Sequence, residues 1–115
     1  MGGEHEEVVR RCIEVWNSGD LSPLDELLAV DYVGHVGSSD HDGGELRKRI
    51  VAYRSRLPGV HFTVLEQTSD DVRVASRLEA KAEVDGRSIR LRGMNICAIV
   101  DGRLSEEWAV WESSE

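Results

Sequence analysis

The sequence predicts an α+β fold in which three N-terminal helices pack on a strongly curved, mostly antiparallel sheet. In the first half of the chain, apolar residues recur every three or four positions, which is the period of a helix with one buried face. After residue 60 they alternate with polar residues, as in a strand with two unlike faces. A run of helices followed by a run of strands favours the α+β class. The 115 residues have the length of one domain, which we place at residues 1–115.

The first helix is expected from Glu4 to Asn17, and Gly19 follows at the position where helices commonly end. Ser22 and Pro23 are suited to the N-cap and the first helical position, which predicts a short second helix through about Ala29. The buried stripe of the first helix consists of Val8, Val9, Cys12, Ile13 and Trp16.

The middle of the chain predicts a short strand, a loop and a third helix. Tyr32 to Val36 is typical of a strand, and Gly37 to Gly44 of a polar loop. The third helix is expected from Glu45 to Leu57 because its apolar residues share one face. Pro58 and Gly59 then end it.

The rest of the chain predicts an antiparallel meander. Two Asp-Gly pairs mark two-residue hairpin turns. The expected strands are Val60 to Thr68, Val72 to Val84, Ile89 to Ile99 and the segment after Asp101-Gly102, with Asp85-Gly86 as the other turn.

The last strand carries an unusual face. An ionised carboxylate is costly to bury without a partner, so acids among apolar residues indicate either the wet rim of the sheet or the wall of a pocket. At the rim, Arg77 or Arg92 can pair with them. Simple alternation places on this face Leu104, Glu106, Trp108, Val110 and Glu112.

Composition restricts the partners. The chain has 14 Lys and Arg against 22 Asp and Glu, a net charge of -8, which argues against nucleic acid and anionic membranes as partners. No secretory signal or run of about 18 apolar residues is visible, so we expect a cytoplasmic protein. Cys12 and Cys97 lie far apart in apolar stretches and are expected to be buried thiols, and no metal site is predicted.

Five segments carry a family resemblance, and together they span nearly the whole chain. They are Val9–Leu21, Leu24–Leu28, Asp31–His35, Gly86–Ile96 and Asp101–Trp108. On these segments the chain resembles the SnoaL-like polyketide cyclase group of the NTF2-like, or cystatin-like α+β cone, superfamily.

The resemblance implies a conical pocket between the sheet and the helices, and pairing through the sheet into a homodimer. It also implies chemistry without a cofactor, in which a carboxylate acts as acid and base during an intramolecular aldol closure. The family's last strand usually ends a Glu-x-Trp-x-x-x-Asp pattern with Asp, and here that position is Glu112. The expected partner is a small, mostly apolar carbonyl compound.

Glu112 and Glu106 are therefore the predicted acid/base residues, with a surface ion pair as the alternative for each. His35 follows a strand and precedes a Gly-rich loop, so it can carry a proton or serve as a hydrogen-bonded structural residue. Arg77 is expected to orient or polarise the substrate, unless it lies on the outer face of the sheet.

Large rings and one amide are the predicted binding residues. The rings suit a flat ligand and equally a core. An amide in an apolar strand must find a partner, either a ligand carbonyl or a backbone group. His41 and His61 are expected to be solvated. The predicted binding residues are Trp16, Tyr32, Tyr53, Asn95 and Trp108.

Two alternatives to a cyclase or isomerase remain open. One is a non-catalytic ligand-binding or dimerisation module of the same fold, which the change from Asp to Glu112 favours. The other is an epoxide hydrolase, because Arg77-x-Glu79 is similar to the Arg-x-Asp pair of limonene epoxide hydrolases. That activity requires Arg77 and Glu79 to face the pocket.

Overall fold

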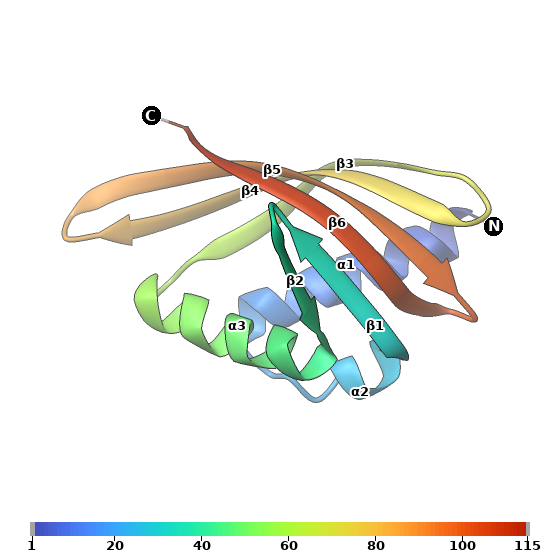
Figure 1. The fold of residues 1–115 in the computed structure, drawn as a ribbon. Helices are drawn as coiled ribbons and strands as arrows, with labels where there is room; N and C mark the ends of the chain where they lie inside the picture. Colours follow the sequence, from blue (N-terminus) through green and yellow to red (C-terminus); the bar gives the residue numbers. More distant parts are fainter. Residues whose placement is uncertain (1, 115) are drawn as a thin grey trace.

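The computed structural model describes residues 2–114, which form three helices and a six-stranded mixed sheet. The helices cover one face of the sheet, which we call the inner face, and no described helix covers the opposite, outer face (Figure 1). This arrangement confirms the predicted α+β class, whereas the strong curvature of the sheet stays a prediction. In chain order the elements are α1 (Gly2–Ser18), α2 (Leu24–Leu27), β1 (Leu28–Val36), β2 (Ser39–Asp42), α3 (Gly43–Arg56), β3 (His61–Ser69), β4 (Arg73–Val84), β5 (Arg87–Val100) and β6 (Arg103–Ser114).

The strand order is β2-β1-β6-β5-β4-β3. The segment from β3 to β6 is the predicted antiparallel meander, but β6 also pairs with β1 in parallel. This pair brings β1 and β2 beside the last strand, although the two regions lie far apart in sequence. Side chains from both ends of the chain can therefore share one site.

The predicted polar loop contains β2, whose His41 pairs with Gly34 of β1. Four polar residues form a strand because the neighbouring backbone offers hydrogen bonds, and this context outweighs their low strand propensity. The Asp42 side chain then accepts a hydrogen bond from the Glu45 amide, and Glu45 reciprocates in a capping box. As a result, α3 begins at Gly43, two residues earlier than predicted.

The second helix is shorter than predicted, and the following strand is longer. α2 ends at Leu27, and β1 begins at Leu28, which pairs with Leu104 of β6. Pairing with a strand distant in sequence decides this boundary, and local patterns do not reveal it.

The two Asp-Gly turns, by contrast, form as predicted. Asp85 and Asp101 have φ of 53°, and the glycine after each is also at positive φ, as a type I′ turn requires.

A bulge in β6 determines which side chains reach the inner face. Leu104 pairs with Ile99 while Glu106 pairs with Ala98, so Ser105 is an extra residue in the ladder. An extra residue reverses the alternation of the strand after it. The residues that consequently face the helices are Glu107, Ala109 and Trp111.

The core lies between the inner face of the sheet and the helices, chiefly α1. Cys12 and Cys97 are buried free thiols within it, as predicted. Among the described residues, no helix combines the length and the apolar character needed to cross a membrane. The largest fully buried side chains of the core are Leu24, Ile50, Leu78, Val9 and Val74.

Candidate functional site

A cavity of about 350 Å³ lies between α1, α3 and the inner face of the sheet. Four aromatic rings from α1, α3, β3 and β6 form much of its wall and pack edge-on or tilted against one another. Its volume falls in the range of small-molecule sites. The aromatic residues are Trp16, Tyr53, Phe62 and Trp111, and the polar or charged residues that also line it are His41, Arg49, Arg56 and Glu107.

Glu107 is the acidic residue that lines this cavity. Tyr32 Oη donates a hydrogen bond to its Oε1 over 3.3 Å, and Asn95 Nδ2 donates to its Oε2 over 3.1 Å. Among the described residues, no Lys or Arg forms an ion pair with this carboxylate. Burial raises the pKa of Glu107 above its usual range, and the two hydrogen bonds oppose that rise.

His41 and Tyr32 extend the network to β2. Tyr32 Oη lies 3.1 Å from His41 Nε2, and the His41 side chain is only 4% exposed. Burial, followed by the positive charge of Arg49, lowers the pKa of His41, so its ring is neutral at neutral pH. The prediction that His41 is solvated was therefore wrong, because β2 turns it inward.

Gly34 makes room for this network. It pairs with His41 on one side and with Glu107 on the other, so the three residues form one row across β2, β1 and β6. A Cβ atom at Gly34 would overlap His41 Nε2 and Tyr32 Oη. Gly93 plays the same part for the cavity wall, since a Cβ there would overlap the Trp111 ring. Both glycines are needed for close approach of a side chain.

Asn95 lies behind Glu107 and is 3% exposed. Its Nδ2 donates to Glu107, while its Oδ1 has no hydrogen-bond partner among the described residues. Tyr32 is equally buried and also does not line the cavity. Of the predicted binding residues, Trp16 and Tyr53 line the cavity, whereas Tyr32 and Asn95 hold the carboxylate from behind.

The structure places the other predicted residues outside the cavity. Because of the bulge at Ser105, Glu106 and Glu112 point to the outer face, so the expectation that they line the inner pocket was wrong. Trp108 lies on the same outer face and stacks on His35 with 5.6 Å between ring centroids. His35 contacts Glu106 at 2.7 Å and Asp40 at 2.8 Å. These hydrogen bonds, first that of Asp40 and then that of Glu106, raise the pKa of His35.

Arg77 and Glu79 also face outward. They alternate with the buried Ser76, Leu78 and Ala80 of β4. Arg77 pairs with Glu66 at 2.8 Å. The structure therefore does not meet the requirement of the epoxide hydrolase alternative.

The sequence analysis missed Glu107, His41 and Trp111. Glu107 and Trp111 were assigned to the wrong face because a strict two-residue alternation has no place for the bulge. One usable signal was present, since a glycine inside the strand Tyr32–Val36 often marks the close approach of another group.

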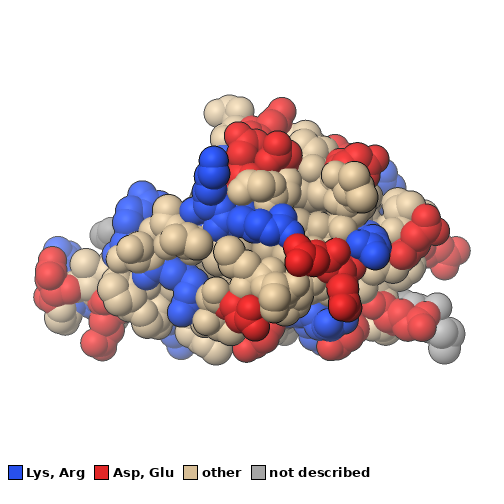
Figure 2. Space-filling view, turned by 90° about the horizontal axis from the view of Figure 1, so that it is seen from below, with Lys and Arg blue, Asp and Glu red and all other residues tan. Residues whose placement is uncertain are grey.

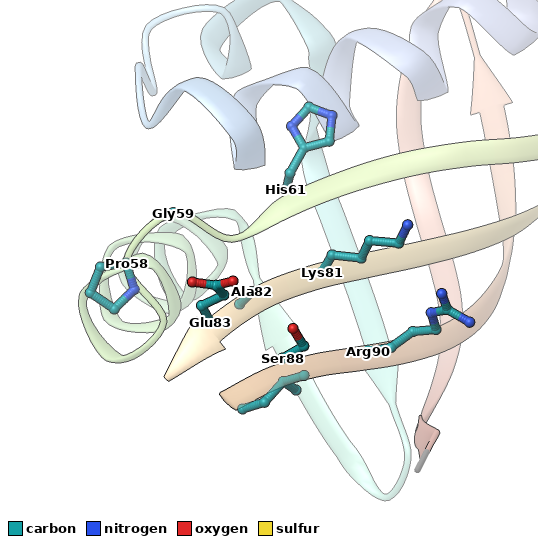
Figure 3. A pocket seen from close by; sticks show the side chains of 9 residues that line it. Pro58, Gly59, His61, Lys81, Ala82, Glu83, Ser88 and Arg90 are labelled. Carbon is teal, nitrogen blue, oxygen red and sulfur yellow. The ribbon is translucent and has the colours of Figure 1, made fainter. Parts of the chain in front are cut away.

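A larger, shallower groove of about 810 Å³ lies near the ends of β3, β4 and β5 (Figure 3). Lys81 and Arg90 extend side by side there along neighbouring strands. Both are paired with the same carboxylate, that of Glu79, at 3.7 Å and 3.4 Å. His61 in this groove is exposed, as predicted. The groove has no counterpart of the Glu107 network, and no cluster of described residues suits a metal ion.

The model of the SnoaL-like polyketide cyclase family matches residues 6–115. The chain therefore belongs to the SnoaL-like polyketide cyclase family, which has the NTF2-like fold.

Solved structures with the same fold include three from other proteins. Wild-type IdmH from Streptomyces antibioticus matches with a TM-score of 0.85 and 24% identity, over 93% of this chain and 91% of that one. AclR from Streptomyces galilaeus matches with a TM-score of 0.82 and 20% identity, over 97% and 91%. A SnoaL-like polyketide cyclase from Agrobacterium tumefaciens matches with a TM-score of 0.79 and 15% identity, over 93% and 90%. At these identities the likeness shows the fold alone, and no curated protein sequence matches.

Proposed function

We propose that the protein is a cofactor-free acid/base enzyme that abstracts a proton next to a carbonyl group of a small, mostly apolar substrate, in an aldol-type cyclisation or an isomerisation. One observation carries the proposal. The Glu107 carboxylate lines an aromatic cavity, without a cation paired to it, and is held by Tyr32 and Asn95. Family membership is consistent with a cyclase.

Proton abstraction needs a base whose pKa lies near the working pH. Desolvation moves Glu107 in that direction, because the cavity disfavours its charged form. In an aldol closure, Glu107 takes the proton from the carbon next to the carbonyl. The electron pair left behind forms a bond to a second carbonyl carbon, and the resulting alkoxide takes the proton back from Glu107.

Tyr32 can form a hydrogen bond with Glu107 in both protonation states of the carboxyl group. When Glu107 is ionised, Tyr32 donates to it and can accept from His41 Nε2. When Glu107 holds a proton, it can donate to Tyr32 Oη, and Tyr32 can donate to His41 Nε2 if the ring proton of His41 is on Nδ1. Tyr32 thus keeps a hydrogen bond to Glu107 in both states, while the second state leaves the buried Nδ1–H of His41 without a partner among the described residues. We therefore assign Tyr32 and His41 as positioning residues.

The test is exchange of the protons next to the carbonyl of 2-tetralone, a bicyclic ketone, in deuterated buffer followed by NMR. We expect the wild-type protein to accelerate exchange and Glu107→Gln to lose about 100-fold or more of that acceleration. Glu106→Gln and Glu112→Gln are matched controls on the outer face of the same strand, and both should stay within about twofold of wild type.

Two results would count against this assignment. If exchange survives in Glu107→Gln but is lost in Glu106→Gln or Glu112→Gln, the base is a carboxylate of the outer face. Ketone binding without any accelerated exchange would favour the non-catalytic module.

We also propose that the protein forms a homodimer through the outer face of the sheet. Four exposed apolar side chains lie together there, because Ile96 pairs with Trp108 and Met94 pairs with Val110 across β5 and β6. Contiguous exposed apolar side chains commonly mark an interaction surface. A second copy of the chain would cover them without obstructing the cavity on the inner face.

A further inference from the structure

We propose that the ligand of the cavity carries an acidic group, such as a carboxylate, that binds to Arg49 and Arg56 on α3. This inference rests on the proposed function, because it takes the cavity as the substrate site. It adds the chemical class of the substrate: an apolar carbonyl compound with one anionic end.

Helix α3 is basic, although the chain as a whole is acidic. The chain as a whole has a net charge of -8, yet α3 contains five basic residues and one acid. Seen from the helical side, much of the Lys and Arg surface lies over the left half and centre of the molecule, on the side where α3 is drawn in Figure 1 (Figure 2). A protein with excess negative charge repels anions in general, so a local basic wall at a cavity indicates where an anion can approach.

Two of the basic residues of α3 have structural partners. Arg47 pairs with Asp25 at 2.8 Å, and Arg54 donates to the carbonyl oxygens of Trp16 and Asn17 at the end of α1. These contacts fasten α3 to α1 and α2. Lys48 is exposed and does not line the cavity.

Arg49 and Arg56 are arranged differently. They lie seven residues apart, which places them two turns apart on one face of the helix, and that face also carries Tyr53 toward the cavity. Arg49 is half-buried and donates to Ser39 Oγ at 2.6 Å. Arg56 is exposed, and its guanidinium lies 5.5 Å from the centre of the Tyr53 ring. Among the described residues, neither has a carboxylate partner.

The positions of the two arginines and of Glu107 determine how the ligand is oriented in the cavity. Glu107 belongs to the sheet wall of the cavity, and the two arginines belong to the α3 wall. A carboxylate prefers guanidinium groups, with which it forms charged hydrogen bonds, and it is repelled by Glu107. A ligand with one acidic end is therefore oriented with its apolar carbonyl end toward the base.

The test compares 2-naphthoate with 2-naphthamide, which has nearly the same shape but no charge. Their dissociation constants are measured by calorimetry at low salt. We expect the wild-type protein to bind naphthoate about tenfold more tightly than naphthamide. In the Arg49→Gln/Arg56→Gln double variant, the two constants should agree within about twofold, with the naphthamide constant unchanged. Lys48→Gln removes one positive charge from the solvent side of α3 and should retain the preference.

Further variants separate this inference from the proposed function. Ala52→Trp, at an exposed position of the cavity wall, should weaken binding of both probes, which places them in the cavity. Glu107→Gln should lose exchange of 2-tetralone but keep the preference for naphthoate. Equal binding of the two probes by the wild type, or an equal loss of preference in Lys48→Gln, would overturn the acidic-end proposal while leaving the role of Glu107 intact.

Discussion

At the scale of single residues, burying the Glu107 carboxylate without a cation lowers the stability of the folded protein. The side chain is partly withdrawn from water, receives two hydrogen bonds and has no cationic partner among the described residues. A carboxylate placed only for stability would have a cation beside it or would lie in solvent, as Glu106 and Glu112 do on the outer face. The arrangement fits a group whose charge changes during a reaction.

This cost predicts a pH-dependent gain in stability from Glu107→Gln. The pKa of Glu107 is raised in the folded state, so folding binds its proton more tightly than the unfolded chain does. Its contribution to the free energy of unfolding therefore falls as pH rises from the unfolded value of about 4.5 through the raised folded value. Glutamine cannot ionise, so the variant should be more stable by about 1 kcal/mol at pH 8.

Urea unfolding of the wild type and of Glu107→Gln at pH 4 and pH 8 measures this effect. The advantage of the variant should shrink at pH 4, where the wild-type carboxyl is mostly protonated in both states. If the variant is less stable than the wild type by the same amount at pH 8 and at pH 4, then ionisation of Glu107 does not destabilise the folded protein.

At the scale of elements, the bulge in β6 decides which carboxylate reaches the cavity. Trp16 and Tyr53, two of the five predicted binding residues, line the cavity, because helical periodicity has no such interruption in α1 and α3; that they bind a ligand stays a prediction. The acids of β6 were assigned to the wrong face, because one extra residue changes the face of everything that follows it. Sequence patterns do not show whether an alternating run contains a bulge.

The bulge can be tested by deletion. Removing Ser105 should leave Glu107, Ala109 and Trp111 on the inner face, because the regular alternation from Leu104 then leads directly to Glu107. We expect this deletion to cost no more than about 2 kcal/mol of unfolding free energy and to retain ketone exchange. Removing Val110, in the regular part of the strand, should turn Trp111 outward and unfold the protein. Thermal unfolding and exchange rates of the two deletions provide the comparison, and equal damage from both would contradict the assigned bulge.

At the scale of the whole molecule, we propose different roles for the two faces of the sheet. The inner face carries the cavity, and the outer face carries the apolar side chains assigned to a dimer. Trp108, predicted as part of the site, belongs to that outer surface, and it stacks on His35, which pairs with Glu106. In the proposed dimer, these three residues would lie at or beside the surface between copies.

The dimer predicts a specific effect of charge on the outer face. Val110→Asp should convert a dimer to a monomer in analytical ultracentrifugation, because a carboxylate buried between two copies has no cation assigned to it. Val51→Asp introduces the same charge at an exposed position of α3 and should remain dimeric. A wild-type protein that sediments as a monomer at all concentrations would remove the proposal.

The sequence by itself determined the fold class, the approximate positions of the helices and the hairpin turns, because periodicity, helix ends and Asp-Gly turns depend on neighbours along the chain. The resemblance of five sequence segments indicated the family. Only the tertiary structure decided the site. The parallel pairing of β1 with β6, the inclusion of β2 in the sheet and the bulge at Ser105 together bring His41, Gly34 and Glu107 into one row. The pairing of β1 with β6 joins segments distant in sequence, whereas β2 pairs with the adjacent β1 and the bulge lies in the β5–β6 hairpin. All three are decided by backbone hydrogen bonds between strands, which the residue pattern of a single strand does not show.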